Sequence, residues 1–157
     1  MKINFIFQQI NKGLSSRFIS LSSQKEIKYL IFNLRKFKNN NFFKETLNIL
    51  IITSLKKKSS LLLANCISTQ LSFLKKHNIF IKFLKISLIL LLKTNFNKLK
   101  GIKILIKGRL NGRLRKNKKT IKLGKLGLNS INSKIEYNES TSFTLDGTIG
   151  VKVWICE

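Results

Sequence analysis

Residues 101–108 have the sequence GIKILIKG, in which three isoleucines alternate with Lys103, Leu105 and Lys107. Successive side chains of a β-strand point to opposite faces, so this alternation is typical of a strand with one buried face. Glycines at positions 108 and 112 then supply a reversal of the chain. The segment predicts a strand whose isoleucines face a core and whose lysines face outward.

Three later segments alternate in the same way. Their regularly spaced residues are Ile121 and Leu123, then Ile131, Ser133, Ile135 and Tyr137, then Ile149, Val151, Val153 and Ile155. Seven of the eight glycines lie between Gly101 and Gly150, so turns are concentrated in the last third of the chain. We therefore expect four strands in a mostly antiparallel sheet. Its outer face would carry Lys103, Lys107, Lys122 and Lys152.

The residues before the sheet predict two helices. Ser59 or Ser60 can cap the first helix, whose apolar residues recur every three or four positions at Leu63, Ile67, Leu71 and Leu74. Asn78 can cap the second, from Ile79 to about Lys93, with a stripe of Phe80, Phe83, Leu84, Leu88 and Leu91. Two helices packed on a four-stranded sheet make an α+β fold.

Charge points to a polyanionic partner. The 157 residues carry 31 Lys and Arg against 6 Asp and Glu, a formal net charge of +25. Apolar residues make up 43% of the chain, which is enough for a core and excludes a disordered basic tail. Self-repulsion at this charge opposes compaction, so we expect the native state to need a polyanion. Nucleic acid is the first choice and an anionic membrane the second.

The cations are concentrated where carboxylates are absent. Between Glu45 and Glu136 there is no acidic residue, although 21 of the 31 cations lie there, ten of them from Lys103 to Lys125. Internal ion pairs cannot neutralise this stretch, which favours phosphate contacts over a solvated loop. The expected RNA contacts are Arg109, Arg113, Arg115, Lys116, Lys118, Lys119, Lys122 and Lys125. Aromatic residues are sparse around them, so phosphate contacts are favoured over base stacking.

Other functional classes find little support. No apolar run approaches the eighteen or so residues of a membrane span. Cys66 and Cys156 are ninety positions apart, which suits neither a metal site nor a disulfide scaffold, and we interpret both as apolar residues. No cofactor or metal is expected. Without a Ser or Asp partner nearby in sequence, His77 is interpreted as an exposed or RNA-facing residue.

Two interpretations concern the C-terminal third. Glu136, Glu139 and Asp146 are interpreted as strand-end residues that balance lysines, although in a nuclease they would gather around a metal. Trp154 is interpreted as a packing residue and not as a platform for bases. A nuclease and a peripheral membrane protein that uses the helix at residues 79–93 remain the alternatives to an RNA-binding protein.

Several motifs together resemble a known family. They are GIKI at 101–104, GRLNG at 108–112, LNSINSKIEY at 128–137 and GTIGVKVWI at 147–155, preceded by ANCISTQL at 64–71. In order and spacing they resemble the C-terminal domain of the small-subunit ribosomal protein three family, over roughly residues 61–157. The resemblance implies an N-terminal extension at 1–25, a degenerate KH-like region at 26–58 and the C-terminal α+β domain at 59–157.

The KH region departs from the family pattern. A KH domain clamps RNA with a Gly-x-x-Gly loop between helices, whereas residues 14–100 contain no glycine. Residues 26–32 and 47–53 are interpreted as remnant strands, with the missing part lost or supplied by a separate chain. The Gly-x-x-Gly matches at 124–127 and 147–150 lie among strands and are interpreted as turns or bulges. Lys125 of the first could still touch phosphate.

The resemblance also implies function. Family members are non-enzymatic constituents of the small ribosomal subunit that bind ribosomal RNA in the subunit head and line the side where messenger RNA enters. Their neighbours are small-subunit proteins ten and fourteen, with four and five at the messenger channel. The implied messenger contacts here are Lys75, Lys76, Lys82 and Lys85. Ile81 replaces an expected arginine, which weakens an unwinding role because lysine lacks the guanidinium fork.

Composition and the first residues indicate a compartment. The abundance of Lys, Asn, Ile, Leu and Phe reflects A/T-rich codons, which suggests an organelle genome. Residues 1–25 lack acidic residues and are rich in serine, like a transit peptide. The retained Met1 favours local synthesis or an uncleaved extension. We therefore expect a ribosome of the mitochondrial matrix and an organelle-encoded chain.

Overall fold

The computed structural model describes residues 32–55, 60–93, 99–112 and 117–156. Residues 34–157 belong to one structural unit. Residues 26–31, most of the first expected KH strand, lie outside the described part of the chain. Residues 113–116 also lie outside it, and they belong to the basic cluster, the run of expected RNA contacts from Arg109 to Lys125.

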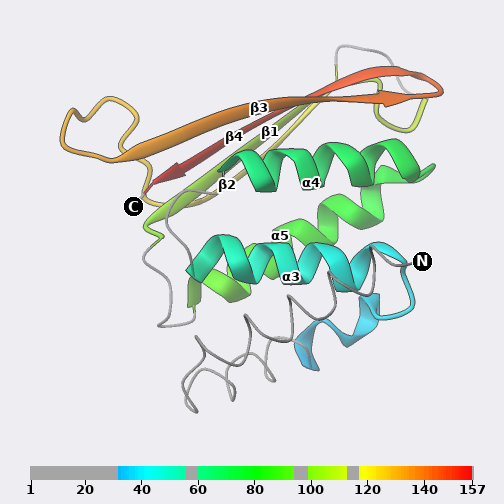
Figure 1. Cartoon of the computed structure of the whole chain (residues 1–157), viewed down its shortest axis with the longest axis horizontal. Helices are drawn as coiled ribbons and strands as arrows, with labels where there is room; N and C mark the ends of the chain where they lie inside the picture. Colours follow the sequence, from blue (N-terminus) through cyan, green and yellow to red (C-terminus); the bar gives the residue numbers. More distant parts are fainter. Residues whose placement is uncertain (1–31, 56–59, 94–98, 113–116, 157) are drawn as a thin grey trace, which may run out of the picture. The chain divides into compact units, whose positions relative to one another are not determined.

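The described residues form helices first and strands second (Figure 1). In chain order the helices are η1 (Arg35–Phe37), α3 (Phe42–Leu55), α4 (Ser60–Phe73) and α5 (His77–Lys93). They are followed by β1 (Gly101–Gly108), η2 (Leu110–Gly112), β2 (Lys118–Gly124), β3 (Ile135–Thr144) and β4 (Gly147–Cys156). The α+β fold with a four-stranded sheet is confirmed, with α3 as a third helix.

The strands form a sheet in the order β2-β1-β4-β3, and every neighbouring pair is antiparallel. Helices α4 and α5 lie along one side of this sheet, and α3 packs against both of them (Figure 1). α4 contacts β3 and β4, while α5 lies near β2 and η2. We call the helix-covered side the inner face and the opposite side, which no described helix covers, the outer face.

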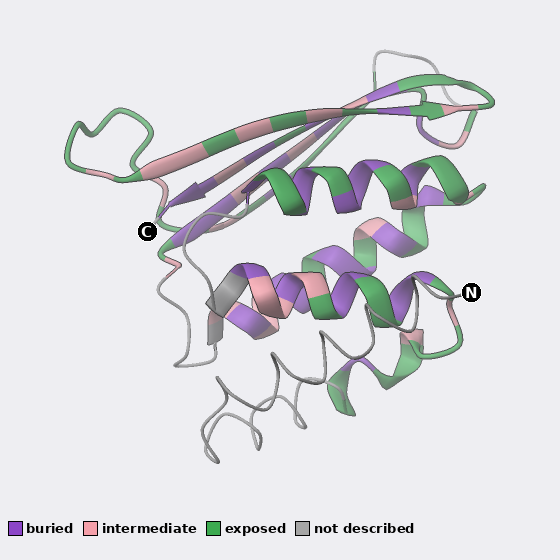
Figure 2. Cartoon of the chain, viewed as in Figure 1, coloured by how far each residue is buried: buried purple, intermediate pink, exposed green. Residues whose placement is uncertain are grey.

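The inner face supplies the core (Figure 2). Its residues on the two central strands are each at most 4% exposed: Ile102, Ile104, Ile106, Ile149, Val151, Val153 and Ile155. The apolar stripes predicted for the two helices meet them, since all but Leu74 of the residues expected there are buried. Burial of this apolar surface is the main force that holds the helices on the sheet.

Helix α3 joins the core through a cluster of phenylalanines. The ring centre of Phe83 on α5 lies 5.4 Å from that of Phe42, 5.9 Å from that of Phe43 and 5.5 Å from that of Phe37. Offset and edge contacts of this kind add to the free energy gained from burial. The cluster ties η1 and the start of α3 to α5.

The strand expected at residues 47–53 is wrong, because these residues lie within α3. The β-branched run at residues 51–53 favours a strand locally. In the fold, however, Phe42, Leu47 and Leu50 are buried. The Thr46 hydroxyl donates to the Phe42 carbonyl at 2.6 Å, so even a β-branched polar residue is accommodated inside the helix. Tertiary packing here outweighs strand propensity.

The third strand is displaced from its expected position. Ile131 and Ser133 lie in the connection between β2 and β3, where Ile131 is fully exposed and the Ser133 hydroxyl donates to the Gly127 carbonyl at 2.6 Å. β3 instead begins at Ile135 and continues to Thr144. Because its inner-face residues are polar, β3 lacks the alternation of apolar and polar residues that indicates a strand in the sequence. These inner-face residues are Glu136, Asn138, Ser140 and Ser142.

Polar groups of α4 meet three of these four residues, while the buried Ser142 hydroxyl has no hydrogen-bond partner among the described residues. The Ser140 hydroxyl donates to the Ala64 carbonyl at 2.7 Å, and the Asn138 amide donates to the Ser60 hydroxyl. The Ser60 backbone N–H donates to the Glu136 carboxylate at 3.4 Å, which places a negative charge at the N-terminus of the helix. Glu136 therefore caps α4 and, among the described residues, forms no salt bridge with a lysine.

Both later Gly-x-x-Gly matches are parts of the sheet and its turns, as expected. Gly124 ends β2 with φ of 73°, and a Cβ there would lie 2.2 Å from the Lys100 carbonyl oxygen. Gly147 and Gly150 both belong to β4. Neither match lies between two helices, so neither has the setting of a KH loop.

Candidate nucleic-acid interface

The outer face of the sheet carries the cations predicted for it. The strand register places five lysines on this face: Lys103, Lys107, Lys118, Lys122 and Lys152. All are exposed except Lys103, which is half-buried. Residues opposite one another on paired strands lie close enough for their side chains to interact. The outer face thus carries lysines on β1, β2 and β4, while its β3 residues include Tyr137 and Glu139 and no lysine.

Two of the cross-strand pairs consist of like charges. Lys103 is the register partner of Lys122, and Lys107 is that of Lys118. Like charges directly opposite one another destabilise a sheet. Within the described part of the chain, none of these four lysines has an ion-pair partner. An anion bound between the paired lysines would reduce this repulsion, and a phosphate group carries the negative charge required.

An aromatic pair lies beside these lysines. Tyr137 of β3 and Trp154 of β4 are register partners, and their ring centres are 5.1 Å apart. Lys103 Nζ lies 4.8 Å from the centre of the Trp154 ring, a cation–π distance. Trp154 does pack, as expected, but it packs on the outer face and not in the core.

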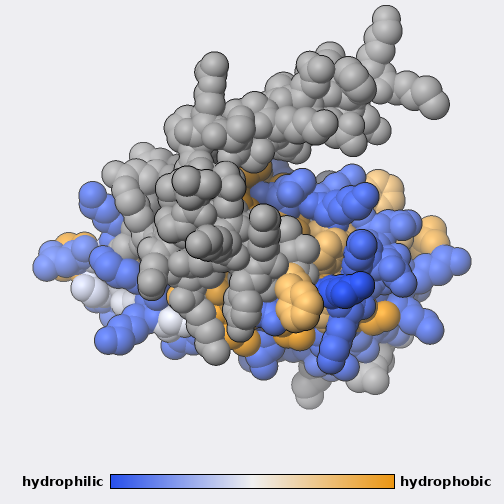
Figure 3. All heavy atoms as spheres, turned by 90° about the horizontal axis from the view of Figure 1, so that it is seen from below, coloured by the Kyte–Doolittle hydropathy of each residue, from blue (hydrophilic) through white to orange (hydrophobic). Residues whose placement is uncertain are grey.

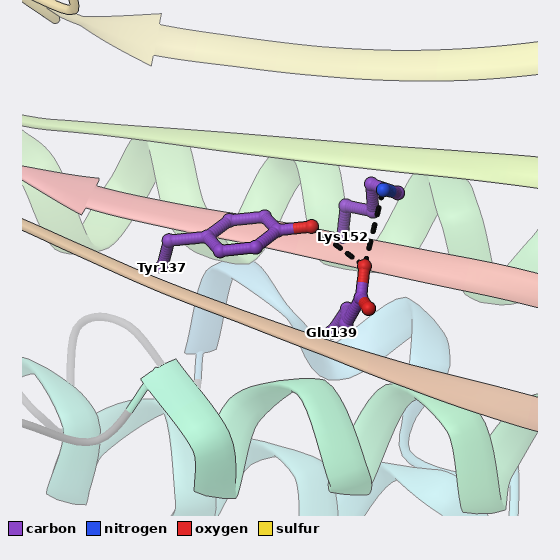
Figure 4. Close-up of polar contacts among 3 residues, drawn as sticks. All are labelled: Tyr137, Glu139 and Lys152. Carbon is purple, nitrogen blue, oxygen red and sulfur yellow. Dashed lines mark hydrogen bonds and ion pairs between the residues drawn. The ribbon is translucent and has the colours of Figure 1, made fainter.

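A salt bridge adjoins the aromatic pair (Figure 4). The Tyr137 hydroxyl donates to Glu139 Oε2 at 2.7 Å, and Lys152 Nζ lies 3.1 Å from the same oxygen. These contacts lower the pKa of Glu139, with the tyrosine hydrogen bond as the largest cause. Hydrogen bonding with Tyr137 and then Glu139 raises the pKa of Lys152. Both ionised forms are therefore favoured at neutral pH.

The eight residues expected to bind RNA divide into three groups. Lys118 and Lys122 lie on the outer face beside lysines of β1. Arg109, Lys119 and Lys125 are exposed elsewhere, at the end of β1, on the edge of β2 and just after β2. Three lie outside the described residues: Arg113, Arg115 and Lys116. Lys103, Lys107 and Lys152 also lie on the outer face. Their alternation with apolar residues in the sequence predicts this position.

The interpretation of His77 as exposed or RNA-facing is wrong. Its side chain is only 2% exposed, and Nε2 lies 3.1 Å from the Leu71 carbonyl oxygen. The Asn111 backbone N–H donates to His77 Nδ1 at 3.2 Å, while the His77 backbone N–H donates to the Asn111 side-chain oxygen at 2.7 Å. The tautomer with hydrogen on Nε2 satisfies all of these contacts.

These reciprocal bonds hold the reversal after β1 against the start of α5. Asn111 has φ of 53°, a left-handed conformation that asparagine tolerates better than most residues. The reversal carries Arg109 and leads into the basic cluster. His77 is therefore a positioning residue for this reversal.

The four lysines implied to contact messenger RNA are all exposed. Lys75 and Lys76 lie between α4 and α5, and Lys82 and Lys85 lie on α5. Figure 3 views the helix side, where hydrophilic side chains surround scattered hydrophobic ones in the described part of the chain. These lysines are on a different part of the surface from the outer face of the sheet.

The apolar stripe of α5 is not available to a membrane. Its residues are at most 6% exposed: Phe80, Phe83, Leu84, Leu88 and Leu91. A peripheral membrane helix would need that stripe at its surface. Among the described helices, none combines the length and the hydropathy required to cross a bilayer.

The carboxylates of the nuclease alternative are separated. Glu136 caps α4 on the inner face, Glu139 lies on the outer face, and Asp146 lies in the turn between β3 and β4. In the described part of the chain no three His, Cys, Asp or Glu side chains are grouped for a metal. Cys66 and Cys156 are buried and are not joined in a disulfide, and burial raises the pKa of Cys66 to about 12.

Comparison with known proteins agrees with this architecture. The family described as "Ribosomal protein S3, C-terminal domain" matches residues 77–155, half of the chain. The small ribosomal subunit protein uS3c of Euglena longa is 40% identical over 57 residues, which cover 36% of this chain and 26% of that protein. Protein uS3 of Dictyoglomus turgidum is 39% identical over 56 residues, or 36% of this chain and 23% of that one.

A third relative extends the range of organisms. Protein uS3 of Karelsulcia muelleri is 46% identical over 55 residues, which cover 35% of this chain and 24% of that protein. The matches thus span about a quarter of the length of each of these three relatives. Helix α5, strands β1 to β3 and all of β4 except its last residue fall within the family match. The chain belongs to the ribosomal protein S3 family, through the C-terminal domain of that family.

Proposed function

We propose that this chain is a structural constituent of the small subunit of a mitochondrial ribosome, where it binds ribosomal RNA in the subunit head. The observation that carries the proposal is the outer face, with five lysines on three of the four paired strands and like charges opposite one another on β1 and β2. The relatives are named as small ribosomal subunit proteins. Phosphate is the abundant anion that such a surface meets in a ribosome.

The basic hairpin is the second part of this RNA contact. Its exposed members on and around β2 would hold phosphates beside the outer face, and His77 fixes the reversal that leads into it. The hairpin residues are Arg109, Arg113, Arg115, Lys116, Lys118, Lys119, Lys122 and Lys125. Lysine and arginine contacts to phosphate set position and affinity but carry no sequence information.

The further details of the proposal concern neighbours. Lys75, Lys76, Lys82 and Lys85 would line the side where messenger RNA enters, since all four are exposed. The protein neighbours would be small-subunit proteins ten and fourteen, and four and five at the channel. Residues 1–25 would form an extension and residues 26–58 the degenerate KH-like region, with a separate chain in the space of the lost KH loop.

Replacement of five hairpin cations tests the RNA contact. Arg113, Arg115, Lys116, Lys118 and Lys119 are changed together to Ala, and RNA affinity is measured over a range of salt concentrations. Each lost phosphate contact should lower the slope of log affinity against log salt by about one unit. The control replaces exposed lysines of η1 and α3, Lys36, Lys38 and Lys44. An unchanged slope in the fivefold variant would exclude the hairpin as a contact site.

Sedimentation tests the assignment to the ribosome. The full chain should migrate with small-subunit particles, and ribonuclease should abolish this migration. Flotation with anionic vesicles that survives ribonuclease would instead support a peripheral membrane protein. Preparation of the particles from isolated mitochondria tests the compartment in the same experiment.

The messenger contact needs a separate measurement. Joint replacement of Lys75, Lys76, Lys82 and Lys85 by Ala should leave incorporation into particles intact, because none of the four belongs to the hairpin or the outer face. Crosslinking of messenger RNA to the assembled particle should fall. Loss of incorporation with these replacements would place the four lysines at an assembly contact instead.

A further inference from the structure

We infer that Tyr137 and Trp154 form a stacking platform for an unpaired nucleotide on the outer face of the sheet. The inference rests on the proposed RNA-binding function and specifies the kind of RNA bound. The sequence favoured phosphate contacts alone, because the two aromatic residues are 17 positions apart and only the β3–β4 pairing brings them together. The ligand is an unpaired base within RNA, not only a backbone phosphate.

The geometry of the aromatic pair supports this inference. Both rings lie on the face that no described helix covers, and Tyr137 is 43% exposed. The ring centres are 5.1 Å apart and the ring planes are tilted by 37°. The two rings are therefore not stacked flat on one another, and together they present a broad aromatic surface. Val153 and Ile155, the chain neighbours of Trp154, are in the core. Only the alternate residue is presented outward.

The charges around the pair indicate its occupant. Trp154 has Lys103 at 4.8 Å from its ring centre, and Lys122 is the next residue in the same cross-strand row. A row that runs Tyr137, Trp154, Lys103, Lys122 therefore places two rings beside two cations. Single-stranded nucleic acid has both complements, a base for the rings and phosphates for the cations. An apolar protein surface would leave the lysines without a counter-charge.

An unpaired strand fits better than a duplex. Bases within a duplex are already stacked on one another, so they cannot offer a free face to an aromatic side chain. Stacking on Tyr and Trp tolerates any base, because every base has a π-face. The inference therefore predicts a preference for single strands without a strong sequence preference.

The single tryptophan of the chain gives a direct measurement. The full chain is titrated with an unstructured oligoribonucleotide while Trp154 fluorescence is recorded, and binding is followed in parallel by anisotropy of a label on the oligoribonucleotide. Stacking should quench the fluorescence as the RNA binds. Inorganic polyphosphate and an RNA duplex of equal length are the controls, and both should bind with little quenching.

Variants separate stacking from charge. Tyr137→Ala should weaken binding of the oligoribonucleotide about tenfold without a change in salt slope, because no phosphate contact is lost. Tyr137→Phe keeps the ring and should bind like the unchanged chain. The matched variant Lys122→Ala should lower the slope by about one unit and leave the quenching at saturation unchanged.

Each outcome is decisive. RNA binding without quenching, or equal quenching by polyphosphate, would overturn the platform and leave the proposed function in place. Absence of RNA binding in both measurements would overturn the proposed function as well. If Tyr137→Ala reduces incorporation into particles while its affinity for the oligoribonucleotide is unchanged, the outer face contacts a protein and the platform is rejected.

Discussion

The two faces of the sheet are built from the same strands and have opposite roles. On β1, Ile102, Ile104 and Ile106 are at most 2% exposed beneath the helices, whereas Lys103 and Lys107 face outward. The period of two along a strand lets one segment supply a core residue and a candidate binding residue in alternation. Substitution of an inner-face residue should therefore change the free energy of unfolding, whereas substitution of its outer-face neighbour should change RNA binding.

The largest effect is expected on the inner face. Ile104 is completely buried on a central strand, so Ile104→Ala should lower the free energy of unfolding by about 2–5 kcal/mol through lost burial and a cavity. Urea denaturation followed by circular dichroism, in salt that screens the cations, measures this change. The control Lys107→Ala, on the outer face of the same strand, should change stability by less than about 0.5 kcal/mol. Equal losses in the two variants would contradict the separation of the faces.

A smaller effect is expected from the polar contacts on the helix side. His77→Ala leaves the Asn111 N–H and the Leu71 carbonyl without their buried partner, at a cost of about 1–3 kcal/mol. The same variant should weaken RNA binding by the hairpin, because the reversal after β1 is no longer held. Lys76→Ala, at the exposed neighbouring position, is the control for stability. A His77→Ala chain as stable as the control would refute the positioning role.

The helix layer and the outer face of the sheet should also differ in how their ionisable groups respond to pH. Burial raises the pKa of Cys66 from 9.0 to about 12, with a further contribution from Glu45. The unfolded thiol ionises first, so the free energy of unfolding should fall as pH rises from 9 towards 12, by at most about 1.4 kcal/mol per pH unit. The difference in stability between the unchanged chain and Cys66→Ala, measured across this range, isolates the contribution. A difference that is independent of pH would contradict it.

The smallest effect is expected on the outer face. Contacts with Tyr137 and Lys152 lower the pKa of Glu139, so its contribution to stability is present above the unfolded pKa and lost as pH falls through the folded pKa. Tyr137→Phe removes the largest cause and should return the pKa towards 4.5. NMR titration of the Glu139 carboxyl carbon measures the shift. An unaltered pKa in Tyr137→Phe would mean that Lys152 alone sets it.

The parts of the fold predicted from sequence are those in which local pattern and burial agree. Residues 101–108 and 149–155 alternate because one side meets the helices, and the structure confirms both strands. β3 was only partly predicted, because Glu136, Asn138 and Ser140 face polar groups of α4 and not an apolar core. A polar inner edge has no apolar period for the sequence to display.

The other incorrect or missing sequence predictions also depend on contacts between residues that are far apart in the chain. Residues 47–53 suggested a strand because of their β-branched run, whereas the helix is selected by contacts of Phe42 and Phe43 with α5. His77 and Asn111 are 34 positions apart, and Tyr137 and Trp154 are 17 apart. Neither pairing can be predicted from the sequence before the arrangement of the helices and strands is known. The lysines of the outer face, by contrast, follow directly from alternation.

The edge position of β2 has a consequence for the newly made protein. β2 ends the sheet on one side, and Lys118, Lys119 and Lys122 lie along it. An open edge is a template for a strand of another chain, and lysines on it oppose that pairing by repulsion. Two free copies of the chain therefore repel each other along this edge. Under the proposed function, the charge that would bind RNA would also oppose aggregation of the free protein.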